Sequence, residues 1–318
     1  MEFKPEITDK IKELQEKYDV MGQDLGAYLD GLLYSNYLSY WDYTHLDTLL
    51  SLQNPRTDFP DEEIFIMYHQ ITELYFKLCL HEMKQIGEKE KLNGAFLLER
   101  VGRINRYFQS LTQSFEVMVQ GMDKEQFLKF RMTLLPASGF QSAQYRKIEI
   151  GATDFHNLVA LDERHAFSEE STIEEMYGHM YWMRGATELQ TGKKTLTLKQ
   201  FEKKYNKDLY EFANVSANTN IWNRYKSISK EEQGNPELIE ALRTLDTLVN
   251  VNWPLAHYKS AVRYLQREPE EIAATGGTNW QKYLPPRFQK RIFYPSLWTE
   301  KEIEEWGKYW VKQALKND

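Results

Sequence analysis

The sequence predicts an all-α protein, and three observations support this prediction. Apolar residues recur at intervals of three and four along several long segments, which is the spacing of one helix face. The longest segment, residues 61–88, is free of proline and nearly free of glycine. No convincing run of alternating apolar and polar residues marks a strand, and we interpret LTLKQF at residues 196–201 as a short hairpin arm or a loop.

The predicted helices follow one another along the whole chain. Residues 7–18 form a charged, amphipathic helix, and the next helix runs from Asp61 to about Glu88, behind Pro60 and with an acidic first turn. Pro254 starts or kinks a later helix. The remaining helices are expected at residues 95–122, 236–250, 254–267 and 300–315, with loops at 54–60, 136–139 and 274–278.

Composition limits the classes of protein to which the chain can belong. With 42% hydrophobic and 27% charged residues, it is expected to fold as one helical domain over residues 1–318, with residues 188–235 as a variable insertion. The net charge of −7 disfavours nucleic acid as a partner. No apolar run reaches membrane-spanning or signal-peptide length, and Cys79 is the single cysteine. These features predict a cytoplasmic protein with no membrane partner.

His257 is the first candidate for chemistry. It follows Trp253 and Pro254 on a predicted helix, with Ala256 beside it and Ser260 close to one turn later. Small neighbours leave lateral room for a flat macrocycle whose iron is bound through the imidazole Nε2. The same small residues also suit a close contact between two helices, so the pattern alone leaves both interpretations open.

His69 and Arg131 are candidates for binding a small zwitterion. Phe65 lies one turn before His69, so an aromatic ring and an imidazole share one helix face and can meet a heteroaromatic ligand. A core histidine with satisfied hydrogen bonds is the alternative. Arg131 precedes an apolar stretch and suits capture of a carboxylate, although a surface arginine is the default interpretation of the pattern alone. The turn Thr275–Thr278 fits a lid over a small polar group.

Four blocks of sequence resemble those of the tryptophan 2,3-dioxygenase family. They occur in the family's order and span most of residues 40–283. The blocks are YWDYTHLDTLLSLQNP at 40–55, DEEIFIMYHQITELYFKLCLHEM at 61–83, FRMTLLPASGFQSAQYRKIE at 130–149, and WPLAHYKSAVRYL at 253–265 followed by TGGT at 275–278. The third block is the most specific, because Pro-x-Ser-Gly-Phe-Gln-Ser-x-Gln-x-Arg is a long string.

The resemblance implies a role for each matching residue. His257 would be the proximal ligand of haem b iron, with Ser138, Trp253 and Gly276 as further cofactor contacts. His69 would be the catalytic residue near the indole N–H of the substrate, either as a base or only as a positioning group. The other substrate contacts would be Phe65 and Phe127 beside the indole ring, Arg131 and Thr275 at the carboxylate, and Tyr40 and Tyr43 from a neighbouring subunit.

The resemblance also implies an activity and an assembly. The family is haem-dependent and uses O2 to open the indole ring of L-tryptophan, giving N-formyl-L-kynurenine at the start of the kynurenine route of tryptophan catabolism. It implies a homotetramer built as a dimer of dimers, in which an N-terminal helical arm, residues 1–45, completes another subunit's site.

Departures from the family pattern keep alternatives open. Asn279 and Trp280 stand after TGGT where the family commonly has Ser-Gly. This change motivates a second hypothesis, an enzyme of the same superfamily that oxygenates a modified indole or another aromatic amino acid. A helical protein that binds haem without oxygenating anything is a third hypothesis, and a helical interaction protein without haem is the fourth.

Overall fold

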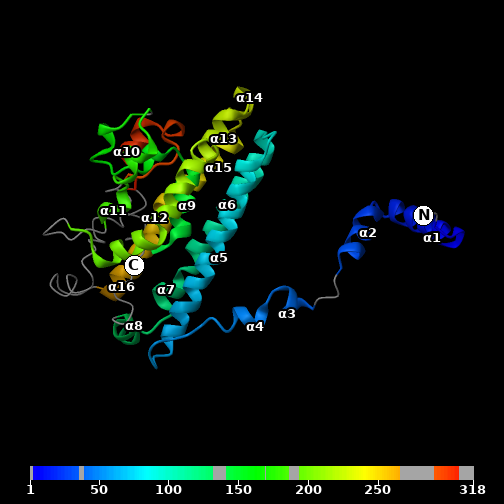
Figure 1. Ribbon diagram of the computed structural model, residues 1–318, viewed down its shortest axis with the longest axis horizontal. Helices are drawn as coiled ribbons and strands as arrows, with labels where there is room; N and C mark the ends of the chain where they lie inside the picture. Colours follow the sequence, from blue (N-terminus) through cyan, green and yellow to red (C-terminus); the bar gives the residue numbers. More distant parts are fainter. Residues whose placement is uncertain are drawn as a thin grey trace. The chain divides into compact units, whose positions relative to one another are not determined.

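The computed structural model describes residues 3–35, 39–131, 141–168, 170–185, 193–265 and 290–307. Over these ranges the regular structure is helical, and strand-like pairing is limited to isolated bridge residues, such as the bridge between Val159 and Met180. The predicted all-α fold is therefore confirmed (Figure 1). None of the described helices combines the length and the apolar character that crossing a membrane requires. The chain divides into two compact units, Met1–Asn54 and Pro55–Asp318, and we describe each by itself.

The first unit is a series of short helices with an apolar surface. Its helices are α1 (Pro5–Val20), α2 (Leu25–Tyr34), α3 (Tyr40–Tyr43) and α4 (Leu46–Leu49). Asp24 caps α2 by accepting a hydrogen bond of 2.8 Å from the amide of Gly26. The side chains of Leu32, Leu33 and Tyr34 are at least 72% exposed within this unit, which is unusual for three consecutive apolar residues.

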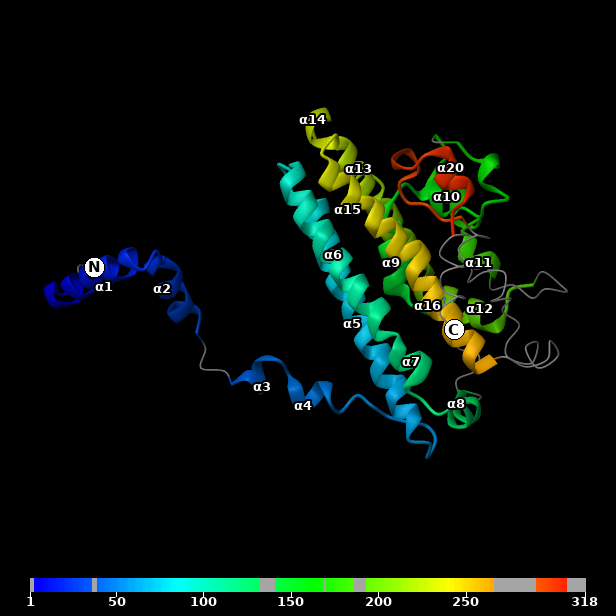
Figure 2. The ribbon, with the colours of Figure 1, turned by 180° about the vertical axis from the view of Figure 1, so that it is seen from behind.

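The second unit is built around a helical hairpin. Helix α5 (Asp61–Glu88) and helix α6 (Gly94–Ser114) are joined by a short loop and run side by side in Figures 1 and 2. Helix α5 has the bounds that the sequence predicts. The buried face of α6 repeats at intervals of four and three, as Leu97, Val101, Ile104, Phe108 and Leu111, all of them fully buried. This period keeps one apolar stripe against α5 and the helices behind it.

Further helices follow in the described part of the second unit. These are α7 (Glu116–Gln120), α8 (Lys124–Phe130), α9 (Ala143–Ala152), α10 (Ile173–Tyr177), α11 (Tyr181–Gly185), α12 (Leu196–Ser216), α13 (Ile221–Ser227), α14 (Lys230–Gln233), α15 (Pro236–Thr247), α16 (Trp253–Leu265) and α20 (Glu300–Glu304). Single turns of 3-10 helix occur at η3 (Phe155–Leu158), η4 (Arg164–Ala166) and η6 (Pro295–Leu297).

The interpretation of residues 196–201 as a hairpin arm or loop is wrong. These residues form the first turns of α12, because the Thr195 hydroxyl caps the helix by accepting from the Leu198 amide at 3.2 Å. Leu198 and Phe201 then begin a buried face that continues through Leu209 and Ala213 at helical spacing. A six-residue window contains too little of this period to distinguish it from alternation.

Two other predicted helices have different ends in the structure. The helix expected over 95–122 breaks at Phe115, which separates α6 from α7. The helix expected over 300–315 stops at Glu304, and Gly307 has a φ of 75°, a left-handed conformation that only glycine adopts readily. Residues 308–315 lie outside the described ranges.

The helices predicted over 236–250 and 254–267 are joined without a break. A π-helix, η5 (Leu248–Asn252), connects α15 to α16, so the three elements form one long rod (Figure 2). Pro254 lies in the first turn of α16, where its missing amide hydrogen removes only one helical hydrogen bond. Pro254 therefore predicted a boundary between two helices, whereas the backbone continues through this point as a helix with one widened turn.

Asp246 holds the C-terminal segment against α15. Its fully buried carboxylate accepts hydrogen bonds from the amides of Phe293 and Tyr294, at 2.9 and 3.1 Å, and from the Trp298 indole at 3.0 Å. The Asn250 side chain adds a fourth, at 2.8 Å. Burial raises the pKa of Asp246 to about 6, against these hydrogen bonds, which favour the ionised form.

A buried charge cluster lies between α9, α11 and the segment near residue 291. Glu149 accepts from Tyr181 at 2.5 Å, pairs with Arg146 at 3.0 Å, and pairs with Arg291 as well. The Tyr181 hydroxyl also accepts hydrogen bonds from both arginines. These side chains compensate one another's charges and hydrogen-bonding groups in the interior. Removal of one of them would therefore leave an uncompensated buried charge.

Candidate functional site

His257 is held as a neutral imidazole on α16. Its Nδ1 atom lies 3.0 Å from the carbonyl oxygen of Trp253, which can only accept, so Nδ1 carries the proton. Burial lowers the pKa of His257 to about 4, and the neighbouring charge of His69 also lowers it. The Nε2 atom consequently keeps its lone pair at neutral pH, and it has no hydrogen-bond partner among the described residues.

Aromatic rings surround His257 on its own side of the bundle. The Trp253 indole meets the imidazole edge-on at a centroid distance of 4.5 Å, and the Phe115 ring lies at the same distance. Trp253 and Phe115 contact each other at 5.2 Å. Ser260, by contrast, donates a long hydrogen bond of 3.4 Å to the Met118 carbonyl, so this small residue does make the close helix contact that was the alternative interpretation. That contact leaves the Nε2 atom of His257 without a partner.

His69 carries the same hydrogen-bonding arrangement on α5. Its Nδ1 atom lies 2.7 Å from the Phe65 carbonyl oxygen, which again places the proton on Nδ1 and leaves Nε2 as an acceptor. The side chain is exposed to solvent, yet burial among the surrounding protein atoms lowers its pKa below the ordinary value of 6.5. The Phe65 ring is 4.1 Å from the imidazole. With Tyr68, Phe115, Phe127 and Phe130 it belongs to a set of rings that we call the aromatic wall.

Phe127 extends the aromatic wall from α5 to α8. Its ring is 6.3 Å from that of Phe65, and it packs on Tyr264 of α16 at 4.5 Å. Phe130 closes the cluster, at 5.7 Å from Phe65 and 5.5 Å from Phe127. These contacts place the side chains of α5, α8 and α16 next to one another, although they lie far apart in the sequence.

Arg131 lies at the edge of this wall as a cation without a carboxylate partner in the described part of the chain. It follows the last residue of α8, and its guanidinium carbon is 5.9 Å from the centre of the Phe127 ring. Desolvation lowers the pKa of Arg131, but a guanidinium remains charged at every physiological pH. A half-buried arginine of this kind is well suited to bind an anionic group of a ligand.

The structure therefore brings together most of the predicted site in the second unit. A series of ring contacts leads from His257 through Phe115 and Tyr68 to His69, and then through Phe65 to Phe127. Sequence reasoning missed Phe115, Phe130 and Tyr264. Only Tyr264 carried a local signal, because it lies two helical turns after His257.

Other predicted residues lie outside the described part of the second unit. Tyr40 and Tyr43 belong to the first unit, where their side chains are 71% and 76% exposed. Ser138, Thr275 and Gly276 lie outside the described residues. The described residues contain no cluster of three or more His, Cys, Asp or Glu side chains that could hold a metal ion.

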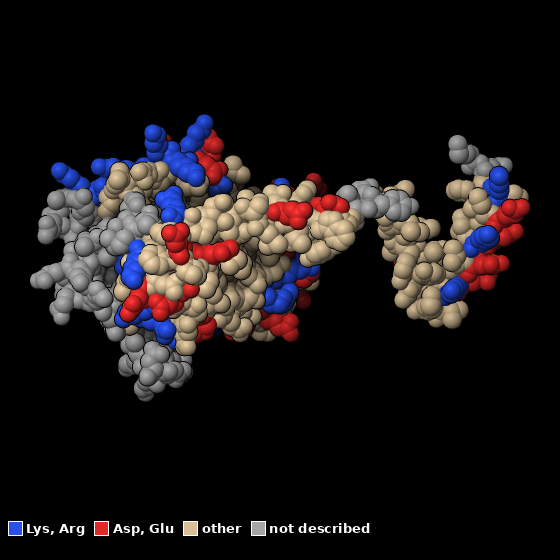
Figure 3. Space-filling view, turned by 90° about the horizontal axis from the view of Figure 1, so that it is seen from below, with Lys and Arg blue, Asp and Glu red and all other residues tan. Residues whose placement is uncertain are grey.

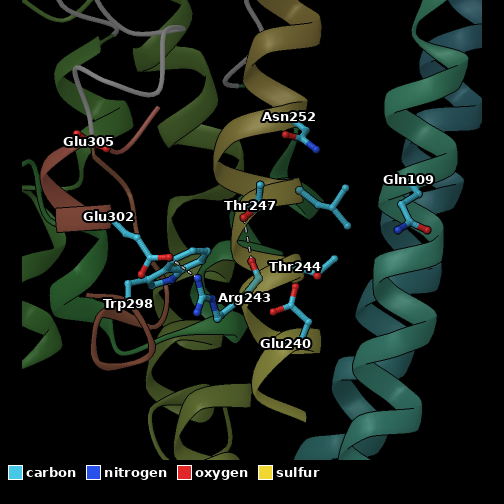
Figure 4. Close-up of a pocket in the computed structure, with 10 residues that line it drawn as sticks. Gln109, Glu240, Arg243, Thr244, Thr247, Asn252, Trp298, Glu302 and Glu305 are labelled. Atoms are coloured by element: carbon cyan, nitrogen blue, oxygen red, sulfur yellow. Dashed lines mark hydrogen bonds and ion pairs between the residues drawn. The ribbon is translucent and has the colours of Figure 1, made fainter. Parts of the chain in front are cut away.

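A cleft of about 590 Å³ opens on another face of the same helical rod (Figure 4). Arg243 dominates its lining, where the guanidinium stacks on Trp298 at 4.2 Å and pairs with Glu302 at 2.5 Å. Thr247 and Asn252 line the cleft beside η5. None of the predicted site residues borders it, so its polar lining belongs to a different part of the molecule.

The fold and the site define an all-α protein in which two neutral histidines, and an arginine with no carboxylate partner among the described residues, border one aromatic wall. The family model of tryptophan 2,3-dioxygenase matches residues 31–211, more than half of the chain. The chain belongs to the tryptophan 2,3-dioxygenase family. The matched region contains Phe65, His69, Phe127 and Arg131 and ends before α16.

Individual relatives match with different coverage. A tryptophan 2,3-dioxygenase of Ruegeria sp. (strain TM1040) is 39% identical over 117 residues, which are 36% of this chain and 42% of that protein. One of Bacillus thuringiensis subsp. konkukian (strain 97-27) is 28% identical over 273 residues, 82% of this chain and 91% of that protein. One of Polaromonas naphthalenivorans (strain CJ2) is 37% identical over 119 residues, 36% of this chain and 41% of that protein. The chain thus spans less than half of some relatives and nine-tenths of others.

Proposed function

We propose that this protein is a haem-dependent dioxygenase that opens the indole ring of L-tryptophan to give N-formyl-L-kynurenine. The observation that carries the proposal is the presence of two neutral histidines beside one aromatic wall that ends at Arg131. In the described part of the chain neither Nε2 atom has a hydrogen-bond partner and Arg131 has no carboxylate partner. The family match and the names of the relatives support the same activity.

The residues around His257 fit a haem group. An iron ligand must be a neutral imidazole with one nitrogen free and the other held by a second hydrogen bond, and His257 meets each requirement. Trp253 would pack beside the ligand, and Ser138 and Gly276, outside the described residues, are proposed as further haem contacts. When bound, haem b supplies the ferrous iron that binds dioxygen, and O2 is the co-substrate.

The remaining residues would recognise tryptophan as a flat zwitterion. Arg131 would pair with the carboxylate, because a half-buried guanidinium without a protein partner is stabilised by an incoming anion. The rings of Phe65 and Phe127 would flank the indole ring, since they contact each other at 6.3 Å with an inclination of 43° and offer one apolar corner to a flat ligand. Thr275, outside the described residues, would assist at the carboxylate and ammonium.

His69 would orient the indole rather than deprotonate it. Its Nε2 lone pair can accept the indole N–H, because Nδ1 is already committed to the Phe65 carbonyl. Burial lowers the pKa of His69, and a base weaker than free imidazole is poorly matched to removing a proton from so weak an acid as indole. We therefore assign His69 a role in fixing the angle of the indole ring in the pocket.

The first unit would supply the assembly. Its apolar surface, together with the exposed rings of Tyr40 and Tyr43, suits burial against another copy of the chain. We propose a homotetramer, a dimer of dimers, in which residues 1–45 reach a neighbouring subunit's site. Residues 1–318 would act as one catalytic domain with a variable segment at 188–235.

A cytoplasmic location, without a nucleic-acid or membrane partner, is part of the proposal. On the face shown in Figure 3, the charged side chains are of both signs, which offers little to a nucleic acid.

The decisive experiment is turnover of L-tryptophan by the ferrous protein under isotopically labelled dioxygen. We expect N-formyl-L-kynurenine that carries both labelled atoms. Turnover of a substituted indole without turnover of L-tryptophan would favour the second hypothesis, in which the altered residues after Thr278 select another substrate. A haem absorption band without any product would favour a non-catalytic haem protein, and a colourless preparation after haem-supplemented expression would leave only a haem-free helical protein.

A further inference from the structure

The π-helix η5 sets which side of the rod carries His257. The apolar stripe of α15 consists of Leu238, Leu242 and Leu245 and continues to Val249. In an uninterrupted α-helix, the residue five turns after Leu238 would be Ala256, since five turns take 18 residues. The wider turn of η5 takes up one more residue, so His257 occupies that position above the stripe.

The widened turn leaves one backbone carbonyl without a helical donor. The amide of Trp253 donates to the Leu248 carbonyl, five residues earlier, and is therefore not used by Val249. The next amide in the π pattern would come from residue 254, which is proline and has no N–H. Val249 is fully buried, and a buried carbonyl left without a donor is costly.

Tyr145 of α9 supplies the missing donor. Its hydroxyl donates to the Val249 carbonyl at 3.0 Å in the interior. The side chain is 6% exposed and packs against Phe76, with ring centroids 5.4 Å apart. Burial raises the pKa of Tyr145, although Arg291, which also forms a hydrogen bond with this side chain, lowers it, so the hydroxyl keeps its proton and remains a donor at neutral pH.

The direction of His257 depends on the backbone that follows this turn. Its Nδ1–H donates to the carbonyl of Trp253, the residue that immediately follows η5. A change from a π turn to an α turn would rotate Trp253 and His257 together by about 100° about the helix axis. On the opposite side of the rod, η5 contributes Leu248 and Asn252 to the cleft in Figure 4, so the turn separates two faces.

We propose that Tyr145 is a positioning residue for this site, whose hydroxyl holds η5 in the register that directs the Nε2 atom of His257 towards the cofactor. The inference rests on the haem-binding role of His257 proposed above. Tyr145 touches neither substrate nor cofactor in this assignment, and it acts through the backbone of Val249 and Trp253.

The test removes the hydroxyl and then restores the donor by another route. In full-length protein, Tyr145→Phe should accelerate haem dissociation by roughly tenfold or more and shift the haem absorption spectrum, as expected when a group supporting a metal ligand is lost. The double variant Tyr145→Phe/Pro254→Ala should recover the wild-type rate and spectrum, because residue 254 then offers its own N–H to Val249. Pro254→Ala alone should resemble wild type.

A matched control separates positioning from simple loss of stability. Tyr225→Phe removes another buried tyrosine hydroxyl that donates to a backbone carbonyl, that of Gln233 at 2.7 Å, and it should leave haem dissociation unchanged. Wild-type haem binding in Tyr145→Phe would overturn the inference, and so would a defect that Pro254→Ala fails to repair.

Amide hydrogen exchange of the apoprotein distinguishes this inference from the proposed function. Exchange at residues 248–256 should increase in Tyr145→Phe and return to the wild-type level in the double variant. A wild-type chain that binds no haem would refute the proposed function, whereas unchanged exchange in Tyr145→Phe would refute the role of the hydroxyl.

Discussion

Helices α5 and α16 present their histidines with the same local device but by different routes. In each, the imidazole Nδ1 donates to the carbonyl four residues earlier, from Phe65 on α5 and from Trp253 on α16. Helix α5 is uninterrupted from Asp61 to Glu88, so the register of His69 follows from its own sequence. The register of His257 depends on a π turn that a different helix stabilises. The tautomer of each histidine is therefore fixed within its own helix. The direction in which the His257 imidazole points is fixed by residues that are distant in the sequence.

The two histidines also differ in environment. His257 is half-buried between Trp253 and Phe115, and burial takes its pKa to about 4. His69 is accessible, and Glu73 opposes the effect of burial on its pKa. The more deeply enclosed histidine suits permanent ligation, and the accessible one suits a substrate that comes and goes.

Replacement of each histidine by alanine should separate the two roles most clearly. His257→Ala should abolish haem retention, because no other described residue offers a free imidazole at that position. His69→Ala should retain haem at the wild-type stoichiometry. The haem absorption per subunit, measured after gel filtration, checks both variants, and haem retained by His257→Ala would refute the ligand assignment.

Arg131→Ala should weaken substrate binding in the part of the site that contains His69 of α5. Loss of a charge-assisted pair is expected to raise the KM for L-tryptophan, by a factor that corresponds to a loss of binding free energy on the order of 2–4 kcal/mol. Tryptamine, which lacks the carboxylate, provides the internal control, since its kinetics should be nearly the same with either residue. An unchanged KM for L-tryptophan would mean that the carboxylate is bound elsewhere.

Asp246→Ala should lower the free energy of unfolding on the α16 side. It would leave the amides of Phe293 and Tyr294 and the Trp298 indole without their buried acceptor, at a cost of about 2–3 kcal/mol. Urea denaturation measures the change. Asp208→Ala is the control, because that exposed carboxylate pairs with Lys147 near the surface and should cost below about 1 kcal/mol.

The smallest expected effect is that of His69→Gln, which keeps a hydrogen-bond acceptor. We expect a decrease in kcat/KM of about tenfold, equivalent to about 1.4 kcal/mol. Because burial lowers the pKa of His69, the wild-type imidazole stays neutral down to a pH below 6.5, and kcat/KM should fall only as the pH drops through that lowered value. The acid limb should be absent in His69→Gln. A thousandfold loss would instead indicate that His69 is a base.

The parts of the fold that the sequence predicted well are those governed by local signals. Helix α5 has its predicted bounds because Pro60, an acidic first turn and a long helical period lie in one continuous stretch. Residues 196–201 were misassigned because the buried face that makes them helical extends to Ala213. The bend at Phe115 and the π turn carried no local signal, since both depend on packing against other helices.

The candidate site divides along the same line. The sequence by itself determined the pairing of Phe65 with His69 and of Trp253 with His257, because residues four apart in a helix always share a face. Only the tertiary structure decided that the two histidines border one wall, that Arg131 has no carboxylate partner in the described part of the chain, and that the His257 ring lies against Phe115. Each of these facts depends on side chains that are remote in sequence, because ring contacts, desolvation and charge pairing are set by what packs against a helix and not by the helix itself.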